Sequence, residues 1–134
     1  MENDARYRNI DIQVDYAADL PLITSDPSQL QQVFLNVLNN AIDAMGKDGE
    51  LNIKTKHITK IHQISIEIND NGPGIPKDVL NKIFDPFFTT KEVGKGTGLG
   101  LSISYSIVEK LGGRMLVASE EGKGTTFTIY MPVT

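Results

Sequence analysis

A long run of helically spaced apolar residues is the strongest constraint on the fold of this chain. Between residues 30 and 45, apolar side chains recur every three or four positions, at Leu30, Val33, Phe34, Val37, Leu38, Ala41, Ile42 and Met45. This spacing places them on one face of an α-helix. Ser25, Asp26 and Pro27 are typical of a helix start, and Gly46 and Gly49 of its end. We therefore expect a long amphipathic helix here.

The other periodic segments predict strands and shorter helices. Residues 8–16 alternate Ile10, Ile12, Val14 and Tyr16 with polar neighbours, which indicates a half-buried strand. Two strand pairs are expected, one from 51–55 and 61–68 with its turn at 57–60, the other from 114–119 and 125–131 with its turn at 120–124. A short helix is expected at 77–84, a long loop at 84–97 and a helix at 98–111. This order favours an α+β two-layer sandwich over a doubly wound parallel sheet.

Composition narrows the class of protein further. A length of 134 residues suits one domain spanning 1–134. The absence of cysteine excludes disulfides, thiolate metal sites and a cysteine nucleophile. With 13 basic and 17 acidic residues, the chain lacks the basic excess of a dedicated nucleic-acid binder. No apolar run approaches the length of a membrane span, and MENDARYRNI does not resemble a signal peptide.

Polar residues form a stripe on the long helix. Asn36, Asn40 and Asp43 are spaced four and three residues apart, so they share one helical face. A solvated helix face would explain the stripe. However, asparagine is a poor helix former, and carboxamide oxygens are suitable ligands for Mg²⁺.

A turn cluster, DNGPGI at 70–75, directly follows a predicted strand. Gly72 and Gly74 would allow the backbone to approach a ligand closely, and Asp70 could accept a hydrogen bond from an exocyclic amine. An ordinary turn capped by the Asp70 side chain is the alternative.

A glycine-rich segment, GKGTGLGLS at 94–102, runs into the last predicted helix. Its successive backbone N–H groups, the helix N-terminus and Lys95 suit a phosphate. The segment matches neither the Walker pattern nor G-x-G-x-x-G. A flexible linker is the alternative interpretation.

Three phenylalanines, Phe84, Phe87 and Phe88, lie in the segment FDPFFTTK at 84–91. Packing of a loop base against the core is the simplest interpretation, and a lid that closes over a ligand is the alternative. His57 and His62 are expected at the surface, with no zinc or Ser-His-Asp pattern around them. The signatures of Ser/Thr/Tyr kinases are also missing.

In this order, the motifs resemble the ATP-binding catalytic domain of sensor histidine kinases, a member of the GHKL superfamily with the Bergerat fold. The matching boxes are FLNVLNNAIDAM (34–45), DNGPGIP (70–76), IFDPFFTTK (83–91) and GKGTGLGLS (94–102), followed by GTTFTIYMP (124–132). The variants NAIDAM and DPFFTTK resemble the nitrogen-regulatory and sporulation type. The resemblance implies a mixed, mostly antiparallel sheet packed on about three helices, with an ATP lid loop.

The resemblance also implies roles for individual residues. Asn40 would be the Mg²⁺ ligand and Asn36 would support the phosphates or the metal, and both count as catalytic. Asp70 would receive the adenine amine, with Thr125 helping through a shared water, and Lys95 would hold the triphosphate. Many family members carry Lys or Arg in place of Asp43, so Lys91 or Lys95 would meet the phosphate charge here. The full cofactor-binding set is Asn36, Asn40, Asp43, Asp70, Gly72, Gly74, Ile75, Phe84, Phe88, Lys91, Lys95, Gly96, Thr97, Gly98, Leu99, Gly100, Leu101 and Thr125.

The implied function is binding of Mg-ATP and donation of its γ-phosphoryl group to a histidine on a separate dimerisation domain, with a response regulator downstream. The chain carries neither that helical domain nor a credible acceptor histidine. We therefore expect a monomeric, cytoplasmic catalytic domain that does not autophosphorylate alone, whether the full protein is soluble or membrane-anchored.

Three alternatives stay open. GHKL ATPases and anti-sigma-factor serine kinases usually carry a glutamate base where this chain has Asn36, which cannot take a proton. A non-catalytic interaction domain of the same fold is disfavoured by the intact Asn40, Asp70 and glycines.

Overall fold

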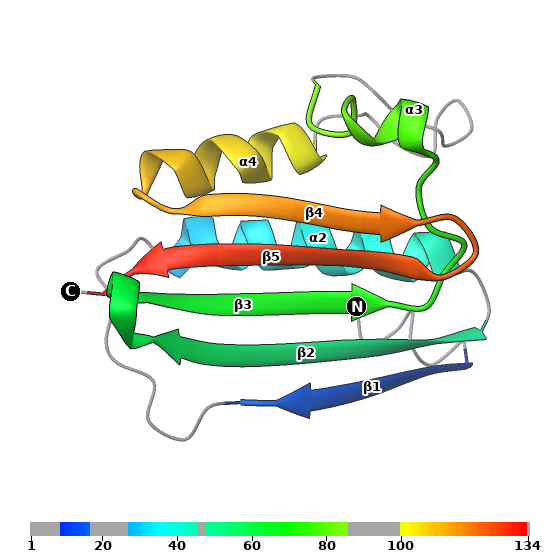
Figure 1. Cartoon of the computed structure of the whole chain (residues 1–134), viewed down its shortest axis with the longest axis horizontal. Coiled ribbons are helices and arrows are strands. Elements are labelled where there is room, and N and C mark those ends of the chain that lie inside the picture. Colours follow the sequence, from blue (N-terminus) through cyan, green and yellow to red (C-terminus); the bar gives the residue numbers. More distant parts are fainter. Residues whose placement is uncertain (1–8, 17–26, 46–47, 86–99, 134) are drawn as a thin grey trace.

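The chain folds into two layers, a five-stranded sheet and a layer of helices (Figure 1). A computed structural model describes residues 9–16, 27–45, 48–85 and 100–133. Their elements are β1 (Asn9–Asp15), α2 (Pro27–Met45), β2 (Asp48–Ile58), the 3-10 helix η1 (Thr59–Ile61), β3 (Gln63–Asp70), α3 (Lys77–Leu80), α4 (Gly100–Lys110), β4 (Arg114–Glu120) and β5 (Gly124–Pro132). The expected α+β sandwich is confirmed.

The sheet has the strand order β1-β2-β3-β5-β4. β1 pairs with β2 in parallel, and the other three pairs are antiparallel, as the mixed and mostly antiparallel expectation required. The last residue of β3, Asp70, lies between Leu51 of β2 and Thr125 of β5 in the register. The end of β3 therefore meets the start of β5 at one end of the sheet, where α3 also lies (Figure 1).

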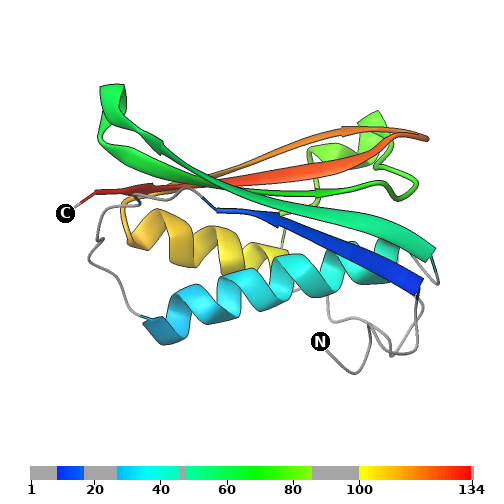
Figure 2. The same cartoon turned by 90° about the horizontal axis from the view of Figure 1, so that it is seen from below.

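Helices α2 and α4 both cover the same face of the sheet, and in the part of the chain that the structure describes neither of them lies on the other face (Figure 2). The two faces are called the inner and the outer face below. Strands present alternate side chains to the two faces, and β5 follows this rule. Its inner residues Thr125, Phe127, Ile129 and Met131 are buried, whereas Thr126, Thr128 and Tyr130 of the outer face are partly exposed.

The core lies between the inner face and α2. It contains Val33, Val37 and Ala41 of α2, which belong to the apolar face expected from the sequence. They pack in one cluster with strand residues that include Leu51, Ile68, Phe127, Ile129 and Met131. Burying one such side chain is worth about 1.5–3 kcal/mol, so this contact holds the two layers together.

The first hairpin turns two residues later than expected. β2 extends to Ile58 and β3 begins at Gln63, with Ile58 paired to Gln63. The turn consists of η1 and His62, whose φ of 52° is left-handed. Ile61, assigned to a strand from the sequence, is instead exposed in this turn. Residues 57–62 contain no glycine, proline, asparagine or aspartate that would have indicated the position of this turn.

The burial expected for the apolar residues of β1 is wrong for all of them except Ile10. Ile10 packs against the core, but Ile12, Val14 and Tyr16 are 37%, 46% and 65% exposed. β1 is an outermost strand of the sheet and pairs only with β2, so its apolar residues lie at the margin of the inner face.

Other elements differ from expectation only in length. α3 is a four-residue helix followed by turns to Phe84, where a helix over 77–84 was expected. β4 and β5 reach to Glu120 and back to Gly124, which shortens the turn between them. Among the described residues, none of the helices combines the length and hydropathy that crossing a bilayer requires.

Candidate functional site

A buried carboxylate lies at the end of β3, on the inner face. Asp70 is only 3% exposed. The backbone N–H of Gly72 donates to its Oδ1 at 2.9 Å, and the backbone N–H of Thr125 donates to the same carboxylate. Desolvation raises the pKa of Asp70 above its ordinary 3.8, and these two N–H donors oppose but do not cancel the rise. A charge held at such a cost is a candidate for binding a ligand.

The segment after Asp70 is tied to the β4–β5 hairpin. The N–H of Ile75 donates to Ser119 Oγ at 2.7 Å, and the N–H of Gly122 donates to the carbonyl of Pro73 at 2.7 Å. Gly74 has a φ of 78°, and a Cβ there would collide with the carbonyl oxygen of Glu120. Only glycine fits this close approach, which explains one glycine of the predicted cluster.

The other side of this segment is tied to β2. Asn71 Oδ1 accepts from the N–H of Glu50 at 2.8 Å, and the N–H of Asn71 donates to the carbonyl of Glu50 at 3.2 Å. Asn71 is therefore a structural residue that closes the end of the sheet. The turn is held from both sides before any ligand arrives.

A pair of hydroxyl groups, of which only Thr125 was predicted, joins the end of β4 to the start of β5. Ser119 Oγ lies 2.9 Å from Thr125 Oγ1 and donates to the carbonyl of Gly124 at 2.9 Å. Gly124 has a φ of 123°, and a Cβ there would collide with the carbonyl oxygen of Asp70. Thr125 was predicted, but Ser119 and Gly124 were not, because Ser119 lies in an ordinary strand sequence near the end of β4 and Gly124 follows an ordinary turn sequence.

The end of α2 lies beside the same segment. A Cβ on Gly72 would be 3.4 Å from Met45 Cγ and 3.6 Å from the backbone carbon of Ala44. The structure therefore brings the end of the long helix and the turn after Asp70 together, as the predicted site requires. Asn40 lies one turn before Ala44 on α2 and is half-buried.

The polar stripe of α2 is more than a solvated face at one position. Asn36 Nδ2 donates to Ser104 Oγ of α4 at 3.1 Å. Ser104 is completely buried, and no motif in the sequence pointed to it. Asp43, at the end of the stripe, is exposed.

Phe84 packs as the base of its segment. Its ring lies 4.9 Å from that of Tyr105 and 6.4 Å from that of Phe127, measured between centroids. Ile75 and Leu101 also pack against the core cluster, as partly buried side chains. These contacts agree with the core-packing interpretation of Phe84 and do not test contact with a ligand.

Part of the predicted site lies outside the described residues. This applies to Phe88, Lys91, Lys95, Gly96, Thr97, Gly98 and Leu99, while Gly100 begins α4. The predicted phosphate loop and lid therefore stay predictions.

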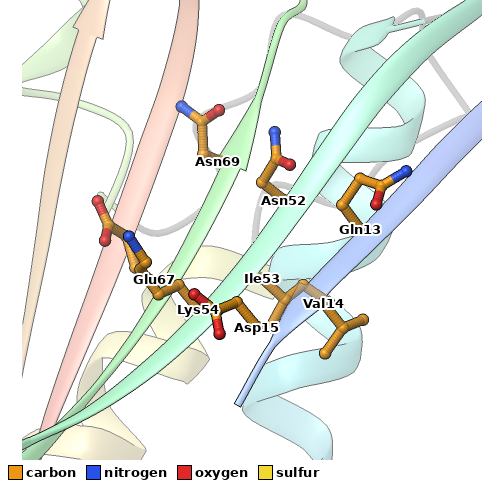
Figure 3. Close-up of a pocket in the computed structure, with 8 residues that line it drawn as sticks. All are labelled: Gln13, Val14, Asp15, Asn52, Ile53, Lys54, Glu67 and Asn69. Carbon is orange, nitrogen blue, oxygen red and sulfur yellow. The ribbon is translucent and has the colours of Figure 1, made fainter. Parts of the chain in front are cut away.

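A concave region lies on the outer face and contains none of the predicted residues (Figure 3). It encloses about 470 Å³ and is lined by Gln13, Val14, Asp15, Asn52, Ile53, Lys54, Glu67 and Asn69 of β1, β2 and β3. Side chains of both charge signs and carboxamides mix there. Within the described part of the chain, no group of three or more His, Cys, Asp or Glu could hold a metal ion.

Comparison with known proteins identifies a family that covers most of the chain. Residues 25–134 match the family described as "Histidine kinase-, DNA gyrase B-, and HSP90-like ATPase". The sensor kinase CckA of Brucella abortus is 45% identical over 93% of this chain, and sporulation kinase E of Bacillus subtilis is 44% identical over 96%. The chain spans only 15% and 17% of the length of these two relatives.

Solved structures agree with the fold. The nucleotide-free catalytic domain of the histidine kinase ThkA matches with a TM-score of 0.85 and 34% identity, over 98% of this chain and 84% of that one. Full-length ShkA in complex with AMPPNP matches with a TM-score of 0.86 and 30% sequence identity. This match covers 98% of the present chain and 27% of the ShkA chain. ThkA in complex with the response regulator TrrA matches with a TM-score of 0.81 and 32% sequence identity. This match covers 99% of the present chain and 37% of the ThkA chain.

The family match covers most of the chain, and the ThkA domain is matched over most of its own length. The chain therefore belongs to the family of histidine kinase-, DNA gyrase B- and HSP90-like ATPases, and within it is a catalytic domain of the sensor histidine kinase type.

Proposed function

We propose that this domain binds Mg-ATP and supplies the γ-phosphoryl group for transfer to a histidine on a separate dimerisation domain. The observation that carries the proposal is the buried, desolvated carboxylate of Asp70 beside the end of α2. The AMPPNP complex of the similar ShkA supports a nucleotide at this fold. The response-regulator complex of the similar ThkA supports a two-component pathway downstream.

Asp70 would recognise the adenine. A carboxylate is an acceptor only, so it suits the exocyclic amine of the base, and a hydrogen bond to a charged group is worth about 1.5–3 kcal/mol. Thr125 is its neighbour in the register and would contribute through a shared water. Gly72, Gly74 and Ile75 would line the base, since this turn is already held in place by β2 and the β4–β5 hairpin.

Asn36 and Asn40 would act at the phosphate end. Carboxamide oxygens are hard ligands that suit Mg²⁺, and both residues lie on one face of α2. When bound, the metal would neutralise charge on the phosphate oxygens. Asn40 would hold it, and Asn36, oriented by its bond to Ser104, would support the phosphates.

The remaining predicted contacts complete the proposal. Lys91 or Lys95 would meet the phosphate charge, since Asp43 stands where many family members carry Lys or Arg. The backbone amides of Gly96, Gly98, Leu99 and Gly100 would hold the triphosphate, with Thr97 and Leu101 alongside. Phe84 and Phe88 would belong to the lid and its base.

Rapid ATP hydrolysis by this domain is disfavoured by the chemistry of Asn36. A carboxamide cannot act as the general base that GHKL ATPases use. The Nδ2 of Asn36 also donates a hydrogen bond to Ser104 of α4. The same argument disfavours the anti-sigma serine-kinase alternative.

Residues 1–134 would form one folding unit that works as a monomeric, cytoplasmic domain. It would act on a dimerisation domain of the same kinase and would not autophosphorylate alone, and it would not bind nucleic acid.

The test is to mix this domain and Mg-ATP with separately produced histidine-bearing dimerisation domains of its sensor-kinase relatives. We expect acid-labile, base-stable phosphohistidine on the dimerisation domain. The Asn40→Ala variant should form none, and its nucleotide affinity should no longer depend on Mg²⁺. ATP binding without phosphohistidine on any of these domains would favour a non-catalytic binding module instead.

A further inference from the structure

We propose that Ser119 is a positioning residue that sets the hydrogen-bond polarity of Thr125 and so contributes to selection of the base. The inference rests on the proposed function, because it assumes that Asp70 and Thr125 face a purine. Ser119 lies on β4 and is partly buried, and it contacts three groups of the site. These are the N–H of Ile75 at 2.7 Å, the carbonyl of Gly124 at 2.9 Å and Thr125 Oγ1 at 2.9 Å.

Counting protons around Ser119 fixes the direction of each bond. The backbone N–H of Ile75 can only donate, so the serine oxygen accepts from it. The carbonyl of Gly124 can only accept, so the single hydroxyl proton of Ser119 points to it. The remaining contact, with Thr125 Oγ1, must then use the proton of Thr125.

Thr125 consequently presents only acceptor lone pairs to a ligand. It lies opposite Asp70 in the register of β3 and β5, and both residues are buried on the inner face. The ionised Asp70 is also an acceptor. The two side chains together form an acceptor-only edge. A water that they share would donate its two protons to them and present a lone pair to the base, which fits a base carrying an amine and opposes a base carrying a carbonyl at the same position.

Without Ser119, this constraint disappears. The Thr125 hydroxyl would be able to rotate and donate, which would let it meet a carbonyl. The N–H of Ile75 would also lose its acceptor, and it lies in the turn that would line the base. Ser119 touches no ligand in this arrangement and acts through Thr125 and Ile75.

The experiment compares ADP with IDP, which carries a carbonyl in place of the amine. Calorimetry with Mg²⁺ would measure both affinities for the unsubstituted domain and for Ser119→Ala, Ser119→Thr and Thr125→Val. For Ser119→Ala we expect about tenfold weaker ADP binding with IDP binding unchanged or stronger, so that the ADP-to-IDP preference narrows. Ser119→Thr keeps the hydroxyl on a strand-favouring residue and should stay within about threefold for both nucleotides.

The double variant Ser119→Ala/Thr125→Val tests the coupling. If Ser119 acts through Thr125, it should narrow the preference no further than either single variant does. Thermal unfolding of each variant checks folding, and if Ser119→Ala does not fold, Thr125→Val against Thr125→Ser carries the test. An equal loss for ADP and IDP, an undiminished preference or additive effects would overturn the proposal. Failure of the unsubstituted domain to bind either nucleotide would instead overturn the proposed function.

Discussion

The two faces of the sheet differ in what their polar residues do. The outer face is rich in charged and amide side chains and includes a concavity of about 470 Å³. The inner face is mostly apolar and contains only a few polar side chains, among them Asp70 and Thr125. Asp70, Thr125 and Ser119, which meet where β3, β5 and β4 adjoin at the candidate site, belong to the inner face. Buried polar groups therefore mark the site better than the density of polar groups does.

The difference has a physical cause. Most polar side chains of the outer face stay partly exposed, although Ser65 of β3 is buried there, so their presence costs little and needs no function. A buried carboxylate must be compensated, and the raised pKa of Asp70 shows that two backbone donors do not suffice. Substitutions on the two faces should therefore have separable effects.

Truncation of the inner core should have the largest effect. Phe127 is 1% exposed, packs in the core cluster and contacts Phe84. Phe127→Ala should lower the free energy of unfolding by about 3–5 kcal/mol, measured by urea denaturation. Thr128→Ala, its outer-face neighbour on β5, is the matched control and should cost under about 1 kcal/mol. Equal losses would contradict the assignment of the two faces.

The link between the helices should give a smaller effect. Ser104 of α4 is buried and accepts from Asn36, whereas Ser106 on the same helix is exposed. Ser104→Ala should cost about 1–3 kcal/mol of unfolding free energy, because the amide of Asn36 loses a buried partner. Ser106→Ala should leave stability within about 0.5 kcal/mol. A neutral Ser104→Ala would show that the bond does not order α2 against α4.

The outer concavity should be the least sensitive region. Lys54→Gln and Glu67→Gln change its charge while keeping polar side chains of comparable length. We expect unfolding free energies within about 0.5 kcal/mol and ADP affinities within about twofold of the original domain. A tenfold loss of ADP affinity would place the outer face in the binding site and remove the contrast between the two faces.

Much of this contrast was predictable from periodicity. The apolar spacing of α2 identified the buried side of the helical layer, and the four motifs predicted a site that includes Asp70 and Asn36. The register was not predictable, since nothing in the sequence locates Ser119 opposite Thr125 or Ser104 opposite Asn36. Such contacts depend on how distant segments pack together, and the local sequence pattern does not report this packing.

The errors have the same origin. The alternation in β1 is real, but whether an alternating strand is central or at the edge depends on sheet order, so Ile12, Val14 and Tyr16 are exposed. The position of the first hairpin turn was mispredicted because its left-handed residue is His62. Glycine or asparagine usually marks such a turn in a sequence.

Replacement of Asp70 by asparagine tests the central claim most directly. Between pH 3.8 and the raised pKa of the folded state, folded Asp70 holds a proton that the unfolded chain has lost, so unfolding free energy falls as pH rises. Asp70→Asn should remove this decline. The unfolding free energy of the variant minus that of the original domain should therefore rise across this pH window and stay constant above it.

The decisive measurement is calorimetric titration of Asp70→Asn with ADP and Mg²⁺ at neutral pH, on protein shown to be folded. The account predicts at least about a hundredfold weaker binding, with unfolding free energy within about 1 kcal/mol of the original. The carboxamide oxygen would accept from the backbone N–H groups of Gly72 and Thr125, so an uncharged NH2 donor would face the base amine in place of a charged acceptor. Unchanged ADP affinity would contradict the account, since Asp70 would then be a structural residue at the end of β3.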